Sequence, residues 1–282
     1  MYSNLKSDCT NCFGLCCIAL PFGKSVDFPF NKDSGVPCRN LCSNNLCGIH
    51  DQLRENGFRG CLSYECFGAG QHVSQSIYNS KDWHEDAEQA KEMFNVFPVV
   101  QQLHEMLWYL QQTLTLKETK SLQNSLQKVY DETVELTIKK PEEILKIDIV
   151  AHRSKVNALL IESSKIYRAN NDKKDQKNRL KKKSDYIGAN LKGLNLQNED
   201  FRGKLMIASN LSQSDLRRAD FIGADLRDAN LSGADLTDVL FLTQSQINSA
   251  VGDVYTKIPS YLERPGHWMN KTFLNILPLK KL

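Results

Sequence analysis

All nine cysteines of this 282-residue chain lie between residues 9 and 66. Their spacing is Cys9-x2-Cys12-x3-Cys16-Cys17, then Cys38-x3-Cys42-x4-Cys47, then Cys61-x4-Cys66. Two thiolates separated by two or three residues can reach one metal ion, and four thiolates suit both tetrahedral zinc and iron–sulfur clusters. The spacing therefore favours a metal-binding unit whose cofactor is an iron–sulfur cluster or zinc, and no pattern in the sequence chooses between the two.

A disulfide framework is the alternative interpretation, and the compartment bears on the choice. Residues 2–8 are mostly polar and lack the apolar core of a secretory signal, and no run reaches the roughly 18 apolar residues that span a bilayer. We therefore expect a cytoplasmic protein with no membrane segment. Dense cysteines in a reducing compartment more often bind metal than form bridges, and nine thiols cannot all pair. The disulfide interpretation would return if a cleaved leader once preceded this sequence.

The cysteine region resembles the YkgJ-type cysteine-cluster family, whose members are described as zinc- or iron-chelating. The resemblance rests on the run from Cys9 to Cys17, on Pro37-Cys38, on Cys47-Gly48-Ile49-His50, and on Gly60-Cys61 with Cys66. It departs from the family at Phe13-Gly14-Leu15, where three residues replace the usual two. The ligands that the family order implies are Cys9, Cys12, Cys16, Cys17, Cys38, Cys47, Cys61 and Cys66, and Cys42 is left out.

Eight thiolates divide evenly into two four-cysteine sites. The neighbours Cys16 and Cys17 support two centres, or one bridged centre, because adjacent side chains point in well-separated directions. His50 and His72 are spare ligand candidates, since imidazole replaces thiolate in some zinc and Rieske sites. A histidine beside cysteines is more often a hydrogen-bond donor or a surface group.

Length and changes in composition divide the chain into five predicted segments. They are a cysteine-rich metal-binding domain (1–80), a helical bundle (81–169), a basic linker (170–183), a repeat block (184–243) and a C-terminal cap and tail (244–282). Apolar residues at three- and four-residue intervals predict bundle helices that begin near Lys81, Ser121 and Pro141. Pro98 should kink or divide the first of them.

Two features of the middle segments carry no functional assignment. The linker is polar and basic with only Leu180 apolar, which predicts solvated chain; without interleaved aromatics, a nucleic-acid contact is disfavoured. His104, His152 and Arg153 lie on predicted amphipathic helices, where histidines are usually structural. We assign them no catalytic role.

Apolar residues recur every five positions in the repeat block. They are Leu191, Leu196, Phe201, Met206, Leu211, Leu216, Phe221, Leu226, Leu231, Leu236 and Phe241. A period of five fits neither helix nor strand, so the chain must turn at each unit and stack its apolar side chains inward. The pattern resembles the pentapeptide-repeat family, which implies a right-handed four-sided β-helix. The predicted fold class is therefore multi-domain, with a cysteine-rich metal-binding N-terminal domain, an α-helical middle and this β-helix at the C-terminus.

The pentapeptide-repeat resemblance also raises topoisomerase binding by mimicry of duplex DNA. Three coils at about 4.8 Å each reach only about 14 Å, and residues 184–282 carry eleven basic and eleven acidic side chains, so mimicry is disfavoured. Four arginines are predicted to face outward and to receive an acidic protein or peptide partner: Arg202, Arg217, Arg218 and Arg227.

Two hypotheses of function follow. The first is an intracellular metalloprotein that transfers electrons to, or assists redox modification of, a protein or peptide partner held by the repeats. The second is a non-enzymatic adaptor or scaffold in which zinc only folds the cysteine region. No catalytic residues can be assigned, because the sequence shows no Ser-His-Asp arrangement, phosphate loop or paired carboxylates. Whether the protein is an enzyme stays open.

Overall fold

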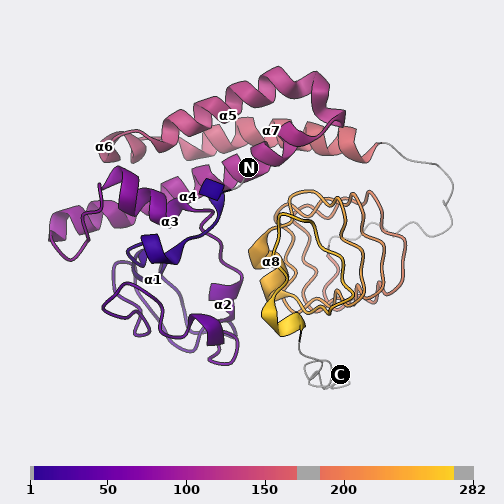
Figure 1. Ribbon diagram of the computed structural model, residues 1–282, viewed down its shortest axis with the longest axis horizontal. Coiled ribbons are helices and arrows are strands. Elements are labelled where there is room, and N and C mark those ends of the chain that lie inside the picture. Colours follow the sequence, from indigo (N-terminus) through magenta and orange to yellow (C-terminus); the bar gives the residue numbers. More distant parts are fainter. Residues whose placement is uncertain (1–2, 170–184, 270–282) are drawn as a thin grey trace. The chain divides into compact units, whose positions relative to one another are not determined.

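The computed structural model describes residues 3–169 and 185–269 (Figure 1). The chain divides into two compact units, Met1–Ser163 and Ser164–Leu282. The five predicted segments are a finer division and stay a prediction. The predicted basic linker, 170–183, and the tail after residue 269 lie outside the described residues. Within the described ranges, no helix combines the length and the apolar character needed to cross a membrane.

Helices dominate the regular structure of the first unit. They are η1 (Ser3–Leu5), η2 (Cys9–Asn11), α1 (Leu15–Ala19), η3 (His50–Gln52), α2 (Arg59–Leu62), α3 (Ala69–Gln71), η4 (His72–Ile77), α4 (Ala87–Thr115), η5 (Glu118–Leu122), α5 (Gln123–Thr137), α6 (Pro141–Ile144) and α7 (Ile149–Arg168). The residues of α7 from Ser164 onward belong to the second unit, together with α8 (Gln244–Ser249) and η7 (Gly266–Trp268).

The long helix α4 is the main support of the first unit. Asp86 begins it by accepting hydrogen bonds from the backbone N–H groups of Glu88 and Gln89, as an N-cap residue does. Pro98 lies inside α4 and does not divide it. Phe97, beside the proline, is completely buried, and the antiparallel helix α5 packs along α4 (Figure 1).

The helix predicted from Pro141 is divided in two. Pro141 begins α6 as expected, but α6 ends at Ile144 and α7 begins at Ile149. The side chain of Asp148 accepts a hydrogen bond from the backbone N–H of Ala151 at 3.0 Å. A carboxylate that binds the N–H groups of a new first turn starts a helix, which explains the break.

The cysteine region has little regular structure and depends on apolar clusters instead. Its two isolated antiparallel bridges join Phe22 to Lys32 and Leu41 to Cys47. The rings of Phe22 and Phe28 stack at 4.2 Å between centroids, and Phe58 is almost fully buried. These aromatics supply the core that a short, loop-rich region otherwise lacks.

The prediction of a four-sided β-helix in the repeat block is wrong. Residues 185–269 contain no β-strand, only single parallel bridges, such as those of Asn190 to Asn210 and Asp200 to Asp220. Two of every five residues form a turn. Too few consecutive residues are left extended for a strand, although backbone hydrogen bonds still join successive turns of the coil, as from the N–H of Leu191 to the carbonyl oxygen of Asn210 at 2.8 Å.

The block is instead a coil of turns that repeats every 20 residues. Every fifth residue from Gly188 to Asp238 has a positive φ, and five of these positions are glycine, which adopts that conformation without strain. The predicted inward residues are buried, and Phe201 stacks on Phe221 with centroids 5.3 Å apart. Beyond Phe241, the short helix α8 begins after a capping box at Thr243.

Candidate metal centre

Helix α1 carries the neighbouring cysteines Cys16 and Cys17. Gly14 precedes it with φ 69°, and a Cβ there would lie 2.9 Å from the carbonyl oxygen of Asn45, so only glycine fits this approach. The two Sγ atoms are 4.0 Å apart. Cys16 packs against the apolar cluster that contains Leu15, whereas Cys17 packs against the cluster that contains Phe58. The helix therefore directs its two thiols to different surroundings.

Four cysteines form the first set, defined as Cys9, Cys12, Cys16 and Cys66. Cys12, Cys16 and Cys66 pack against the same apolar cluster. A Cβ on Gly70 would lie 2.7 Å from the Sγ of Cys12 and 3.9 Å from that of Cys66, so these two thiols border one small space. Cys9 is exposed, and its carbonyl oxygen accepts from the backbone N–H of Cys12 at 3.3 Å, which places Cys9 next to this set.

Four other cysteines form the second set, defined as Cys17, Cys38, Cys47 and Cys61. Cys38 is buried within the cluster of Leu53 and Phe58, and the other three pack against that cluster. The backbone N–H of Cys38 donates to the carbonyl oxygen of Cys17 at 2.9 Å, and the thiols of Cys17 and Cys47 share a hydrogen bond. The two sets meet at Cys16 and Cys17.

Burial and hydrogen bonding favour the protonated form of two thiols in the second set, Cys17 and Cys47, and of Cys12 and Cys61. It raises the pKa of Cys12 to about 11 and that of Cys61 to about 12. Hydrogen bonding to Cys16 raises the pKa of Cys17, and hydrogen bonding to Cys17 raises that of Cys47. A cysteine nucleophile needs a lowered pKa, so Cys12, Cys17, Cys47 and Cys61 are poorly suited to thiol catalysis at neutral pH.

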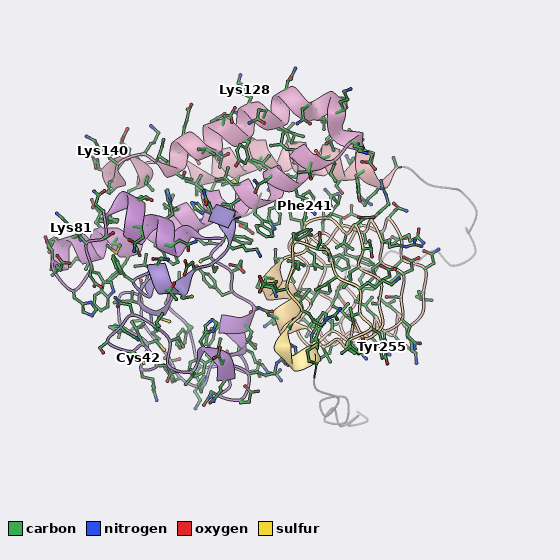
Figure 2. The ribbon with its side chains drawn as sticks, viewed as in Figure 1. Cys42, Lys81, Lys128, Lys140, Phe241 and Tyr255 are labelled. Carbon is green, nitrogen blue, oxygen red and sulfur yellow. The ribbon has the colours of Figure 1, made fainter. Side chains whose placement is uncertain are left out.

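The remaining sequence candidates lie apart from these sets. Cys42 is exposed among the loops of the cysteine region (Figure 2). His50 is exposed, and its ring faces Asp51 at 3.5 Å. His72 Nε2 lies 2.9 Å from the carbonyl oxygen of Thr137, in the helical part of the unit. All nine cysteines are free thiols.

The donors match a metal site in type and number, but not in their present distances. Within residues 3–169 and 185–269, no three His, Cys, Asp or Glu side chains are grouped closely enough to hold a metal ion as they stand. The sets are thus defined by shared surroundings and hydrogen bonds. Binding would require the thiols of each set to draw together.

The two bundle histidines have structural partners. His104 is buried, and its Nδ1 lies 2.8 Å from the carbonyl oxygen of Phe67. Burial lowers the pKa of His104 to about 4, so the ring is neutral near pH 7. His152 is also buried, with Nε2 2.9 Å from the hydroxyl oxygen of Thr133.

The four arginines predicted to face outward all have partners within the second unit. Arg202, Arg217 and Arg227 each bind, through two nitrogens, the aspartate two residues earlier in the chain. The guanidinium of Arg218 lies 3.7 Å from the centroid of the Tyr167 ring. Arg217 has the most exposed side chain of the three in ion pairs, at 48%.

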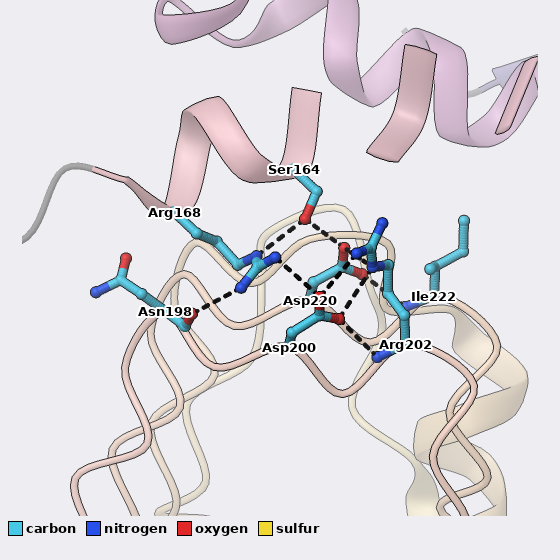
Figure 3. A network of polar contacts seen from close by, with 7 residues as sticks. All are labelled: Ser164, Arg168, Asn198, Asp200, Arg202, Asp220 and Ile222. Carbon is cyan, nitrogen blue, oxygen red and sulfur yellow. Dashed lines mark hydrogen bonds and ion pairs between the residues drawn. The ribbon is translucent and has the colours of Figure 1, made fainter. Parts of the chain in front are cut away.

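A buried polar network joins the end of α7 to the repeats, both within the second unit (Figure 3). The hydroxyl of Ser164 donates to Asp220 at 2.5 Å, and Arg168 donates to Ser164 and to Asp200. Arg202 Nε lies 3.5 Å from Asp220. Sequence reasoning missed this network, because Asp220 is one of many aspartates at the same place in the repeat.

Comparison with known proteins gives the family. Residues 206–241 match the model of pentapeptide repeats, in eight copies. The chain is 50% identical over 268 residues to the uncharacterized protein YybG of Bacillus subtilis (strain 168). The aligned region makes up 95% of this chain and 96% of YybG. It belongs to the YybG family. The resemblance to YkgJ-type proteins is not among these matches and stays a prediction.

One buried residue of this YybG-family chain was not predicted at all. Lys32 is only 5% exposed, and its ammonium group donates to three backbone carbonyl groups beside α1. Lysine is rarely buried, and nothing in the sequence around Lys32 marks it as different from the surface lysines. Only the fold places it next to the helix that carries Cys16 and Cys17.

Proposed function

We propose that this chain is a metal-binding pentapeptide-repeat protein in which the two cysteine sets hold two zinc or iron–sulfur centres. The observation that carries the proposal is the separation of eight cysteines into two sets of four, with Cys16 and Cys17 contributing one thiol to each. Four thiolates complete the coordination of one zinc ion or one cluster.

The chemistry of the donors supports this proposal. Cys9, Cys12, Cys16 and Cys66 would hold one centre, and Cys17, Cys38, Cys47 and Cys61 the other. A metal binds thiolates and displaces their protons. Buried thiols with raised pKa values are poor nucleophiles, but they exclude water from a bound metal and surround it with sulfur.

Two roles are compatible with such centres. An iron–sulfur cluster would supply electron transfer to, or redox-assisted modification of, a protein or peptide bound by the repeat block. Zinc has no redox chemistry in proteins, so zinc centres would make the chain a folded adaptor. The exposed side of the coil around Arg217 is the candidate surface for the partner.

The metal content of the purified protein tests the proposal. We expect about two centres per chain after anaerobic purification, measured by elemental analysis and protein concentration. Brown protein with broad absorption at about 400 nm would indicate cysteine-ligated iron, whereas colourless protein with stoichiometric zinc would indicate the adaptor. Folded protein without metal would refute both roles.

Three matched variants test the assignment to sets. Cys12→Ser should remove the first centre and Cys61→Ser the second, whereas Cys42→Ser should keep both. The double variant of Cys12 and Cys61 should retain none. Equal losses in all three single variants would contradict the division into two sets, even if the protein binds metal.

A further inference from the structure

The segment from Lys32 to Cys38 covers the C-terminal end of α1. The carbonyl oxygen of Cys17 accepts from the N–H of Cys38, that of Ile18 accepts from the N–H of Gly35, and that of Ala19 accepts from the hydroxyl of Ser34. The last carbonyl groups of a helix have no partner within the helix. Neutral groups of this segment already satisfy three of them.

Lys32 adds a positive charge to this neutral set of donors. Its Nζ donates to the carbonyl oxygens of Ile18 at 2.9 Å, Leu20 at 2.6 Å and Asp33 at 3.1 Å, so all three ammonium protons are used. Its backbone is fixed by two hydrogen bonds with Phe22, at 2.9 and 2.8 Å. The side chain is held in one place.

A buried ammonium group normally needs an anion, because carbonyl dipoles only partly replace water. Lys32 forms no ion pair with a carboxylate among the residues that the structure describes. Its Nζ lies 5.8 Å from the centroid of the Phe22 ring, and Phe22 packs against the same apolar cluster as the four cysteines of the second set. The charge is therefore placed beside the second set.

We infer that Lys32 is the counter-cation of the metal centre held by the second set and stabilises its excess negative charge. Four thiolates around one divalent ion leave two negative charges, and a cluster with four thiolates is likewise anionic. A fixed ammonium in low-dielectric surroundings offsets that charge far more strongly than a solvated lysine would.

This inference rests on the proposed function, and three variants of the full-length protein separate the two. Lys32→Gln keeps hydrogen-bond donors and removes the charge; Lys32→Arg keeps the charge. Ser34→Ala removes a neutral donor to the same helix end and serves as the matched control. Zinc affinity is measured by competition with a chromophoric chelator, with two centres fitted separately.

We expect Lys32→Gln to weaken zinc binding at one centre at least tenfold, while the other centre is unchanged. Lys32→Arg should stay within about threefold of the original protein, and so should Ser34→Ala. In a combined variant with Cys61→Ser, which lacks the second centre, Lys32→Gln should have no further effect. A merely structural lysine would not show this dependence on the second set.

The remaining outcomes are also decisive. If Lys32→Gln binds both zinc ions as tightly as the original protein, the counter-cation role is wrong although the metal proposal stands. If the original protein binds no zinc and no iron, both proposals fail. A Lys32→Gln chain that is unfolded without metal is assayed by the zinc concentration at which it folds, which should rise at least tenfold. Failure of both lysine variants to fold in saturating zinc would overturn the inference, because the site would then require the shape of lysine and not its charge.

Discussion

The carboxyl group of Asp220 should make the repeat block more stable as the pH falls toward 4. Asp220 is fully buried, and burial raises its pKa from 3.8 to about 6, despite hydrogen bonds from Ser164 and the N–H of Ile222 and the charge of Arg202. The negative charge of Asp200, which also pairs with Arg202, raises the pKa of Asp220 further. The folded block thus binds this proton more tightly than the unfolded chain does.

The size of the effect follows from the shift. A shift of one pH unit corresponds to 1.36 kcal/mol, so a rise of about two units makes the free energy of unfolding about 3 kcal/mol smaller above pH 6 than below pH 4. The protonated carboxyl group contributes its full stabilisation below the pKa of Asp220 in the unfolded chain, near 3.8. This stabilisation is lost as the pH rises through the folded value near 6.

Asp220→Asn isolates this contribution. Asparagine keeps an oxygen for the N–H of Ile222 and an amide group near Ser164, but it does not titrate. The difference in unfolding free energy between the two proteins cancels other titrating groups, including His104. We expect this difference to change by about 3 kcal/mol between pH 4 and pH 7.5, in favour of the variant at the higher pH.

Urea unfolding at several pH values, followed by ¹⁹F NMR of fluorotryptophan, provides the assay. Trp268 is buried in the second unit and its Nε1 donates to the carbonyl oxygen of Ala250, so its signal reports that unit.

Asp215→Asn is the control with the opposite sign. Burial acts to raise the pKa of Asp215, but hydrogen bonds from Arg217 and Gln197 hold it below its usual value. The loss of unfolding free energy caused by Asp215→Asn should therefore shrink as the pH falls. Parallel pH profiles of unfolding free energy for Asp220→Asn and the original protein would refute the reasoning.

Three further variants test the packing of the repeat core, the first cysteine set and the start of α7. Phe221→Ala should lower the stability of the second unit by about 3–5 kcal/mol in urea unfolding, because the ring is fully buried; a loss below about 1 kcal/mol would contradict its place in the core. Gly70→Ala should displace the thiol of Cys12, 2.7 Å from the new methyl group, and reduce metal content by one centre in elemental analysis; unchanged content would show that Cys12 is not a ligand. Asp148→Ala removes the acceptor for the N–H of Ala151 and should cost about 0.5–2 kcal/mol in thermal or urea unfolding; no change would mean that α7 does not depend on this cap.

The sequence predicted which repeat residues are buried, but not the backbone that buries them. Side chains such as Leu216 follow the five-residue period, because a period of five forces one side chain per unit inward. The β-helix that the pentapeptide-repeat resemblance implies is the part that is wrong. Turn residues occupy too much of each unit for strands to form, and single bridges such as Asp215 to Asp235 are what remains.

In the first unit, local sequence patterns predicted helix starts better than they predicted contacts between distant residues. Pro141 marks a helix start as predicted, whereas the role of Asp148 became visible only with the break after Ile144. Pro98 is accommodated within α4, since the packing of a long helix can outweigh one missing hydrogen bond. Lys32 could not be predicted, because its burial depends on contacts with residues 12 to 14 positions away.

Arg202, Arg217 and Arg227 each pair with the aspartate two residues earlier, and this pairing has a consequence for long-range attraction. Opposite charges within one hydrogen bond of each other act as a dipole, whose potential decays faster with distance than that of a single charge. Salt screens what remains beyond about 8–10 Å. A charged partner would therefore be steered only weakly toward Arg202, Arg217 or Arg227, and its association rate would depend little on ionic strength. Any recognition at this surface would have to come from close contact after collision.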